Sequence, residues 1–134
     1  RPYIPLGSVR EALHYPGKIN MADEETIEYL ELCHIGYLKD KLDVVADWTH
    51  VLSIGEQQRL AFCRAHIQKP IWLFLDEATS AFDEETEGAM YELLKTKLPG
   101  TTLVSVGHRS TLNTYHEKVL RINKETKIVS FEEL

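Results

Sequence analysis

The sequence has 134 residues, of which 43% are hydrophobic and 27% charged, and its formal net charge is −6. This size and composition predict one globular domain, and the negative charge with scattered lysines argues against nucleic acid as a partner. The longest apolar run, residues 71–75, is far short of the roughly 20 residues that span a bilayer, and no leading segment resembles a signal peptide, so we expect this piece to be soluble.

Before Pro70 the apolar residues repeat at helical spacing, so the first half of the chain is expected to be helical. The expected elements are, in chain order, a short helix capped by Ser8 and running through Leu13, a helix from Asp23 to Cys33, a short helix near Tyr37 to Lys41, and a loop with Asp47 and Trp48. Ser53 and Glu56 form a capping-box pattern that starts a longer helix, which runs toward Gln68 and ends before Pro70. We expect Gln57, Gln58 and Arg59 of this helix to form a solvated face.

After Pro70, short β-branched or aromatic runs alternate with one clear helix. The expected elements are a strand from Ile71 to Leu75, a helix capped by Asp83 and running from Glu84 to about Lys97, a strand from Thr101 to Val106, a short helix near Thr111 to His116, and a hairpin of Val119 to Ile122 with Ile128 to Phe131. Strand 71–75 is apolar at every position, which indicates a central parallel strand covered on both faces, and 101–106 is expected to be a second buried strand. Helices, then strand–helix–strand, then a hairpin predict an α/β fold.

Chemically useful side chains follow both expected strands. Asp76 and Glu77 come directly after the first strand, and His108 follows shortly after the end of the second. Ligands in open α/β sheets gather beyond the carboxyl ends of strands, so parallel neighbouring strands would bring His108 to the same rim as Glu77. Taken alone, an apolar run followed by two acids more often just caps a loop, and a histidine after a strand is usually a surface residue.

The start of the long helix is a second candidate site. Ser53 to Glu56 present a helix N-terminus with exposed backbone N–H groups and a small residue, Gly55, which suits an anion. Ser53 as a plain helix cap is the simpler interpretation, and both can hold at once.

The run LSIGEQQRLAFCRAHIQKPIWLFLDEATSAFD, residues 52–83, resembles the signature, Walker B and D-loop motifs of the ATP-binding-cassette (ABC) ATPase family, in that family's order. The resemblance implies a P-loop NTPase-like fold with ATP and Mg²⁺ as cofactors. It implies that Asp76 holds Mg²⁺ through water, that Glu77 orients or deprotonates the attacking water, and that His108 contacts the γ-phosphate. The residues it assigns to nucleotide binding are Ser53, Gly55, Glu56, Asp76, Ser80 and Asp83.

The sequence departs from the family pattern at several points. No G-x-x-x-x-G-K-[ST] phosphate loop occurs between Arg1 and Leu134, so the chain is expected to be a C-terminal fragment that binds ATP weakly, turns none over alone and exposes apolar surface that invites self-association. Ile54 and Phe82 stand where Gly and Leu are usual. Residues 1–69 are expected to form the helical signature subdomain, and residues 70–134 the catalytic α/β portion of the same domain.

The motifs around Asp47–Trp48 and Ser105–Ser110 resemble fused permease–ATPase half-transporters of the peroxisomal fatty-acyl and bacterial peptide or vitamin B12 uptake type. The resemblance implies ATP hydrolysis coupled to solute transport, a head-to-tail dimer with a second ABC ATPase subunit, and a transmembrane permease domain fused upstream. It places the chain at the cytoplasmic face of a membrane, such as the bacterial inner membrane. Two alternatives are a soluble ABC ATPase of DNA repair or translation and a non-catalytic docking module.

Overall fold

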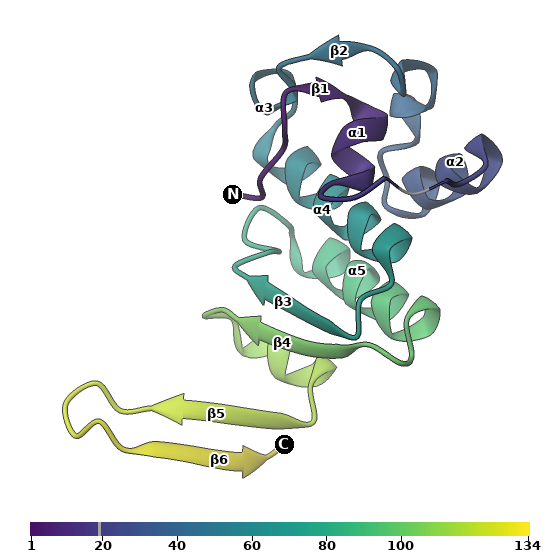
Figure 1. Ribbon diagram of the computed structural model, residues 1–134. Coiled ribbons are helices and arrows are strands. Elements are labelled where there is room, and N and C mark those ends of the chain that lie inside the picture. The colour runs from purple at the N-terminus through teal and green to yellow at the C-terminus, as the bar shows by residue number, and fades with distance from the viewer. Residues whose placement is uncertain (19) are drawn as a thin grey trace.

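The first half of the chain folds into helices and the second into strands around one long helix, as expected (Figure 1). The computed structural model describes residues 1–18 and 20–134. The elements before Pro70 are β1 (Gly7–Ser8), α1 (Val9–His14), α2 (Asp23–Leu32), a 3₁₀ helix (Gly36–Lys41), β2 (Val45–Ala46), α3 (Trp48–Val51) and α4 (Ile54–Gln68). Those after it are β3 (Trp72–Asp76), α5 (Glu84–Lys97), β4 (Thr102–Val106), a 3₁₀ helix (Ser110–Tyr115), β5 (Lys118–Ile122) and β6 (Val129–Glu133).

The three predicted caps start three helices. Ser8 and Ser53 each form a reciprocal capping box, with Glu11 and Glu56, at the starts of α1 and α4. The Asp83 carboxylate accepts the Thr86 N–H at 2.7 Å and so caps α5. These hydrogen bonds lie within three residues of the cap, which is why the pattern predicts them.

Helix α4 lies at the centre of the core. Its buried residues include Leu60, Phe62 and Cys63. The Phe62 ring lies 6.0 Å from the Phe82 ring and 6.3 Å from the Tyr91 ring, centroid to centroid, so α4 also packs on the second half of the chain. The helical and strand-containing halves share one hydrophobic cluster, and the proposed division at residues 69/70 stays a prediction.

The sheet topology matches the predicted α/β order. Strands β3 and β4 pair in parallel, from Trp72 opposite Thr102 to Asp76 opposite Val106, with α5 as the connection. Strands β5 and β6 form the predicted antiparallel hairpin. Strands β1 and β2 form a two-residue antiparallel pair that was not predicted, because two residues are too few to show a period.

The prediction that residues 71–75 and 101–106 are buried strands is wrong for one face of the sheet. Trp72 is 58% exposed and Phe74 72% exposed, whereas Leu75 is buried. Val104 and Val106 are exposed on β4. Helix α5 lies behind the two strands in Figure 1, and none of the described residues covers the opposite face. Apolar surface is exposed here as expected, while self-association stays a prediction.

Trp48 was expected in a loop but begins helix α3 and is buried. Its indole N–H donates to the backbone carbonyls of Gly7 at 3.1 Å and Val44 at 3.2 Å. The indole therefore ties β1 to the segment before α4, a contact between residues 41 positions apart. A four-residue helix whose first residue is held from elsewhere in the fold has little local signal.

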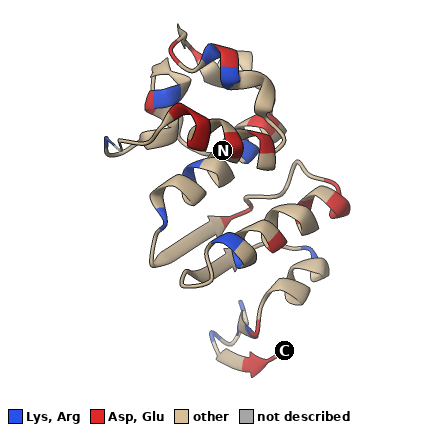
Figure 2. Cartoon of the chain, turned by 90° about the vertical axis from the view of Figure 1, so that its right-hand side faces the viewer, with Lys and Arg blue, Asp and Glu red and all other residues tan. Residues whose placement is uncertain are grey.

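Charged residues of both signs are distributed along the chain. Figure 2 shows Lys and Arg spread over several elements, with acidic residues among them. The expectation of no nucleic-acid partner stays a prediction. Among the residues that the structure describes, no helix is both long and apolar enough to span a membrane.

His66 is a buried titratable group in the middle of this packing. It lies on α4 and stacks on Tyr29 of α2, with ring centroids 5.7 Å apart. Neither ring nitrogen has a hydrogen-bond partner among the described residues. Burial, and to a lesser degree the charge of Lys97, lowers the pKa of His66 from 6.5 to about 4. The native state therefore favours the neutral imidazole.

Acidification should destabilise the chain through His66. Between pH 6.5 and about 4 the unfolded state binds a proton that the folded state does not, so the free energy of unfolding should fall as the pH falls through this window. His66→Phe keeps an aromatic ring to stack on Tyr29 but has no titratable group. In urea denaturation at several pH values, it should reduce the dependence of the free energy of unfolding on pH. His34→Asn is the matched control, since His34 is exposed with a φ of 61° that asparagine tolerates. An equal slope in wild type and His66→Phe would contradict the prediction.

Candidate functional site

The carboxyl ends of β3 and β4 bring together the acid and the imidazole that the sequence singled out. Beyond the last paired residues, the Glu77 N–H donates to the Val106 carbonyl at 2.9 Å, which extends the ladder by one step. The Glu77 carboxylate then lies 3.1 Å from the His108 Nε2 atom. The predicted common rim is present in the structure, while the catalytic roles of the two side chains stay predictions.

The backbone of Glu77 is in a conformation that non-glycine residues rarely adopt. Its φ is 51°, in the left-handed region, which costs a residue with a Cβ about 1–2 kcal/mol. The Glu77 N–H bond to Val106 and a bond from the Gln58 side chain to the Glu77 carbonyl, at 3.3 Å, hold it there. Strained backbone of this kind clusters at functional sites, and no pattern in the sequence predicts it.

Asp76, the predicted metal-binding residue, is exposed at the end of β3. Across residues 1–18 and 20–134 no three His, Cys, Asp or Glu side chains are grouped to hold a metal ion. Mg²⁺ in nucleotide sites is bound through one or two carboxylates together with waters and phosphates. A single exposed carboxylate therefore fits Mg²⁺ that arrives with a nucleotide, and does not fit a metal held by the protein alone.

The predicted anion site at the start of α4 is occupied by its own cap. The Ser53 hydroxyl accepts the Glu56 N–H at 3.1 Å, and the Glu56 carboxylate accepts the Ser53 N–H at 2.9 Å. The simpler interpretation of Ser53 as a cap is confirmed, and its phosphate contact stays a prediction. A Cβ on Gly55 would lie 3.8 Å from the Ala81 carbonyl, so this turn lies against the segment after β3.

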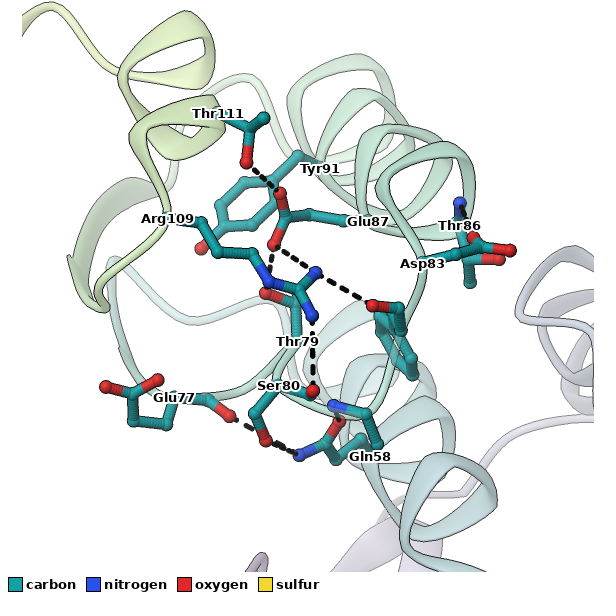
Figure 3. Close-up of polar contacts among 12 residues, drawn as sticks. Gln58, Glu77, Thr79, Ser80, Asp83, Thr86, Glu87, Tyr91, Arg109 and Thr111 are labelled. Atoms are coloured by element: carbon teal, nitrogen blue, oxygen red, sulfur yellow. Dashed lines mark hydrogen bonds and ion pairs between the residues drawn. The ribbon is translucent and has the colours of Figure 1, made fainter.

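Gln58 was expected on a solvated face and is buried instead. Its amide nitrogen donates to the Ser80 hydroxyl at 2.9 Å as well as to the Glu77 carbonyl, and its amide oxygen accepts the Ala81 N–H at 3.1 Å (Figure 3). Helix α4 thus holds the turn after β3 through one side chain. The expectation fails because a glutamine looks solvent-facing until its partners, about 20 residues away in sequence, are known.

Gln57 is also buried, contrary to the same expectation. Its amide donates to the Thr49 and Leu52 carbonyls, each at 3.0 Å, and so fastens α3 to α4. Gln57 lies three residues before buried Leu60, so helical spacing could have placed it on the inward face. Arg59 of the same stretch is half-buried and donates to the His34 carbonyl at 3.0 Å.

The two D-loop residues that the sequence singled out serve the local structure. The Ser80 hydroxyl accepts a hydrogen bond from the Gln58 side-chain amide, and the Asp83 carboxylate caps α5. The backbone and side-chain hydrogen bonds from Thr86, aided by the charge of Arg109, lower the pKa of Asp83 from its ordinary value. Among the described residues, neither side chain bonds to Glu77 or His108, so a nucleotide contact by Ser80 or Asp83 stays a prediction.

Arg109 and Glu87 are two polar residues at the site that the sequence analysis missed. Arg109 follows His108, and its guanidinium donates to the Phe82 carbonyl at 2.7 Å and the Ser80 carbonyl at 3.3 Å. Glu87, on α5, is fully buried beside it (Figure 3). Glu87 lies three and seven residues before Met90 and Leu94, so helical spacing places this acid on the inward stripe.

A cleft of about 430 Å³ reaches this rim. It is lined by residues of the N-terminal segment, α4 and β3, which include Asp76 and Glu77 as well as apolar residues such as Phe62 and Phe74. A volume of this size is within the range of small-molecule sites.

The model for the ABC transporter family matches residues 5–80, which is more than half of the chain. The chain belongs to the ABC transporter family. The relatives that it matches include an uncharacterized ABC transporter ATP-binding protein of Haemophilus influenzae, 48% identical over 121 residues, and the lysosomal cobalamin transporter ABCD4 of Mus musculus, 38% identical over 134 residues. These alignments cover 90% and 92% of this chain.

A solved structure of a bacterial Atm1-family ABC exporter with ATP bound superposes with a TM-score of 0.72 at 25% identity, over 87% of this chain. The predicted fold class, an α/β fragment of the P-loop NTPase-like ABC ATPase, is confirmed. The chain spans 20% and 22% of the length of the two relatives and 21% of the exporter chain.

Removing the Gln58 amide should loosen the Walker B turn of this ABC chain. Gln58→Met keeps the length of the side chain but leaves the Ala81 N–H and the Glu77 carbonyl without that partner. We expect a loss of about 1–3 kcal/mol in the free energy of unfolding, measured by urea denaturation. Glu92→Met on the exposed side of α5 is the control, expected within about 0.5 kcal/mol of wild type. A Gln58→Met variant as stable as the control would show that these bonds contribute nothing.

Proposed function

We propose that the chain is the C-terminal part of the ATP-binding domain of an ABC transporter, and that this domain couples ATP binding and hydrolysis to movement of a solute across a membrane. The observation that carries the proposal is the 3.1 Å contact between Glu77 and His108 at the joined ends of two parallel strands, in a chain of this family. In this proposal residues 1–69 form the helical signature subdomain and residues 70–134 the catalytic portion.

Under this proposal, each residue at the rim has a separate role in ATP hydrolysis. Bound ATP with Mg²⁺ supplies the γ-phosphate and the positive charge that neutralises it. Glu77 orients the attacking water and accepts its proton, and His108 contacts the γ-phosphate, where a neutral imidazole can donate one hydrogen bond and accept another. Asp76 would hold the Mg²⁺ that arrives with the nucleotide. The two acids and the histidine are all accessible enough to meet a ligand.

The signature turn serves a different nucleotide from the Walker B acids. We assign Ser53, Gly55 and Glu56 to the γ-phosphate of ATP held by a second ABC ATPase subunit in a head-to-tail dimer, with Ser80 and Asp83 at the contact between subunits. The exposed position of Ser53 and its N-terminal place on α4, a 15-residue helix, support this assignment.

We infer that the complete protein also contains a transmembrane permease domain, fused upstream, and that this chain lies at the cytoplasmic face of the membrane. The relatives are about five times longer than their matched parts, since those parts make up 20% and 22% of their lengths. One relative is named a lysosomal cobalamin transporter and the similar structure is named an exporter, which supports transport as the task of the complete protein.

Glu77→Gln in the full-length protein should abolish ATP turnover while leaving ATP binding intact. Loss of a positioned general base typically lowers a rate by about 10²- to 10⁴-fold. Phosphate release measures the turnover, and size exclusion with ATP should show a trapped dimer. Glu92→Gln, the same substitution at an exposed position of α5, should behave as wild type. Near-normal turnover by Glu77→Gln would remove this acid from the mechanism.

Residues 1–134 alone should bind ATP weakly and hydrolyse none. The phosphate-loop backbone and lysine that cradle the β- and γ-phosphates have no counterpart in this sequence, so most of the phosphate contacts are missing. Titration with a fluorescent ATP analogue measures the affinity, and phosphate release measures the turnover. Micromolar affinity together with steady hydrolysis would contradict the prediction.

A further inference from the structure

Glu77 and His108 form an exposed rim at the carboxyl ends of β3 and β4. Behind this rim, one fully buried acid bonds to both segments that carry these two residues. Glu87 on α5 faces inward with Met90 and Leu94, and its side chain is 1% exposed. A carboxylate in such a place is costly unless hydrogen bonds and an opposite charge satisfy it. Replacing buried ion pairs by apolar residues is often neutral for stability, so the packing of α5 alone does not call for an acid here.

The partners of Glu87 come from two separate loops. One carboxylate oxygen accepts the Thr79 hydroxyl at 2.6 Å, and the other accepts the Thr111 hydroxyl at 2.7 Å. The Arg109 guanidinium lies 3.5 Å from the first oxygen and also donates to the Phe82 carbonyl. Figure 3 shows Glu87 between Thr111 and Arg109, with Thr79 below them. The acid therefore joins the turn after β3 to the segment after β4.

These anchor points are close in sequence to the rim residues. Thr79 lies two residues after Glu77, and Arg109 is adjacent to His108. A chain spans at most about 3.6 Å per residue, so fixing Thr79 and Arg109 confines Glu77 and His108 to a small volume.

The contact between Glu77 and His108 cannot supply this alignment itself. The His108 side chain is 93% exposed and that of Glu77 is 42% exposed. Ion pairs and hydrogen bonds at such exposure contribute little to holding two side chains in one geometry. The pairing of β3 with β4 brings the two segments to the same level, and groups behind the rim must hold them there. Glu87 is the buried charged side chain, among the described residues, that bonds to both segments, while the half-exposed Arg109 adds a direct link from the second segment to the Phe82 and Ser80 carbonyls of the first.

We propose that Glu87 is a positioning residue of the ATPase site: its buried carboxylate, bonded to Thr79, Thr111 and Arg109, sets the relative placement of Glu77 and His108. This inference rests on the proposed function for its kinetic consequence. Its geometric consequence does not depend on ATP.

The kinetic test uses the full-length protein with Glu87→Gln. The isosteric amide loses the negative charge that faces Arg109, and its nitrogen can only donate, so one of the two hydroxyl bonds must reverse its direction. The two segments should therefore shift relative to each other. We expect kcat for ATP to fall by about tenfold or more, with KM for ATP changed by less than about threefold, because small displacements of reacting groups slow chemistry more than binding. Glu92→Gln is the matched control and should leave both constants unchanged.

A geometric test uses residues 1–134 without nucleotide. The His108 ring signals in a ¹H–¹³C correlation spectrum, assigned with His108→Gln, should move in Glu87→Gln, while the signals of distant His34 and His50 stay in place. Glu92→Gln should move none of them. Unchanged His108 signals in a folded Glu87→Gln variant would overturn the proposal.

Further variants separate positioning from a merely structural role. If Glu87→Gln does not fold, Thr111→Val removes one donor without changing the shape of the side chain and must itself lower kcat and move the His108 signals. If Glu87 and Arg109 act as one unit, Glu87→Gln with Arg109→Gln should lower kcat no further than the stronger single variant. Normal kcat per folded molecule in these variants would assign Glu87 to the fold alone.

The two proposals can fail separately. A wild-type protein without ATPase activity would refute the proposed function, and the His108 signals would still decide the placement by Glu87. A protein in which Glu77→Gln stops turnover but Glu87→Gln changes neither kcat nor the His108 signals would retain the function and refute the positioning role.

Discussion

The arrangement of the site depends on the in-register parallel pairing of β3 with β4. Because Asp76 lies opposite Val106, the chain leaves both strands at the same level, and the Glu77 N–H can extend the ladder to the Val106 carbonyl. A slip of one residue would turn every side chain on one strand to the other face of the sheet. The meeting of Glu77 and His108 is thus a consequence of strand register.

The two long helices do more than cover the sheet. Helix α4 contributes Gln58 and helix α5 contributes Glu87, and each places one buried polar side chain under the turn after β3. In both cases the side chain bonds to more than one group on that turn or its neighbour. Buried polar groups with all partners in place specify one arrangement of the backbone around them, because every alternative leaves a donor or acceptor unpaired.

The features that could be predicted from the sequence are those set by residues close together along the chain. The capping boxes and the Asp83 cap need only residues three apart, and the order of strand, helix and strand needs only periodicity. The burial of Gln58 and Glu87 depends on partners 8 to 24 residues away in sequence. The exposure of Trp72 and Phe74 depends on what lies against the sheet. The sequence analysis missed Glu87 because an acid is expected on the exposed side of a helix, although its spacing from Met90 and Leu94 places it on their side. The left-handed backbone of Glu77 has no sequence signal, because only tertiary bonds hold it.

The Glu77–His108 contact is exposed, whereas Gln58 and Glu87, which hold the backbone beneath it, are buried. This difference suits a site whose side chains must separate when a ligand binds. An exposed contact such as that of His108 with Glu77 is worth about 1 kcal/mol or less, so under the proposed function a phosphate could separate the two side chains at little cost. The bonds of Glu87 and Gln58 lie in a region of low dielectric, where each is harder to break. A ligand can therefore rearrange the tips of the side chains without disturbing the backbone that carries them. The strained φ of Glu77 supports the same division, since the backbone keeps this conformation only while the buried bonds hold it.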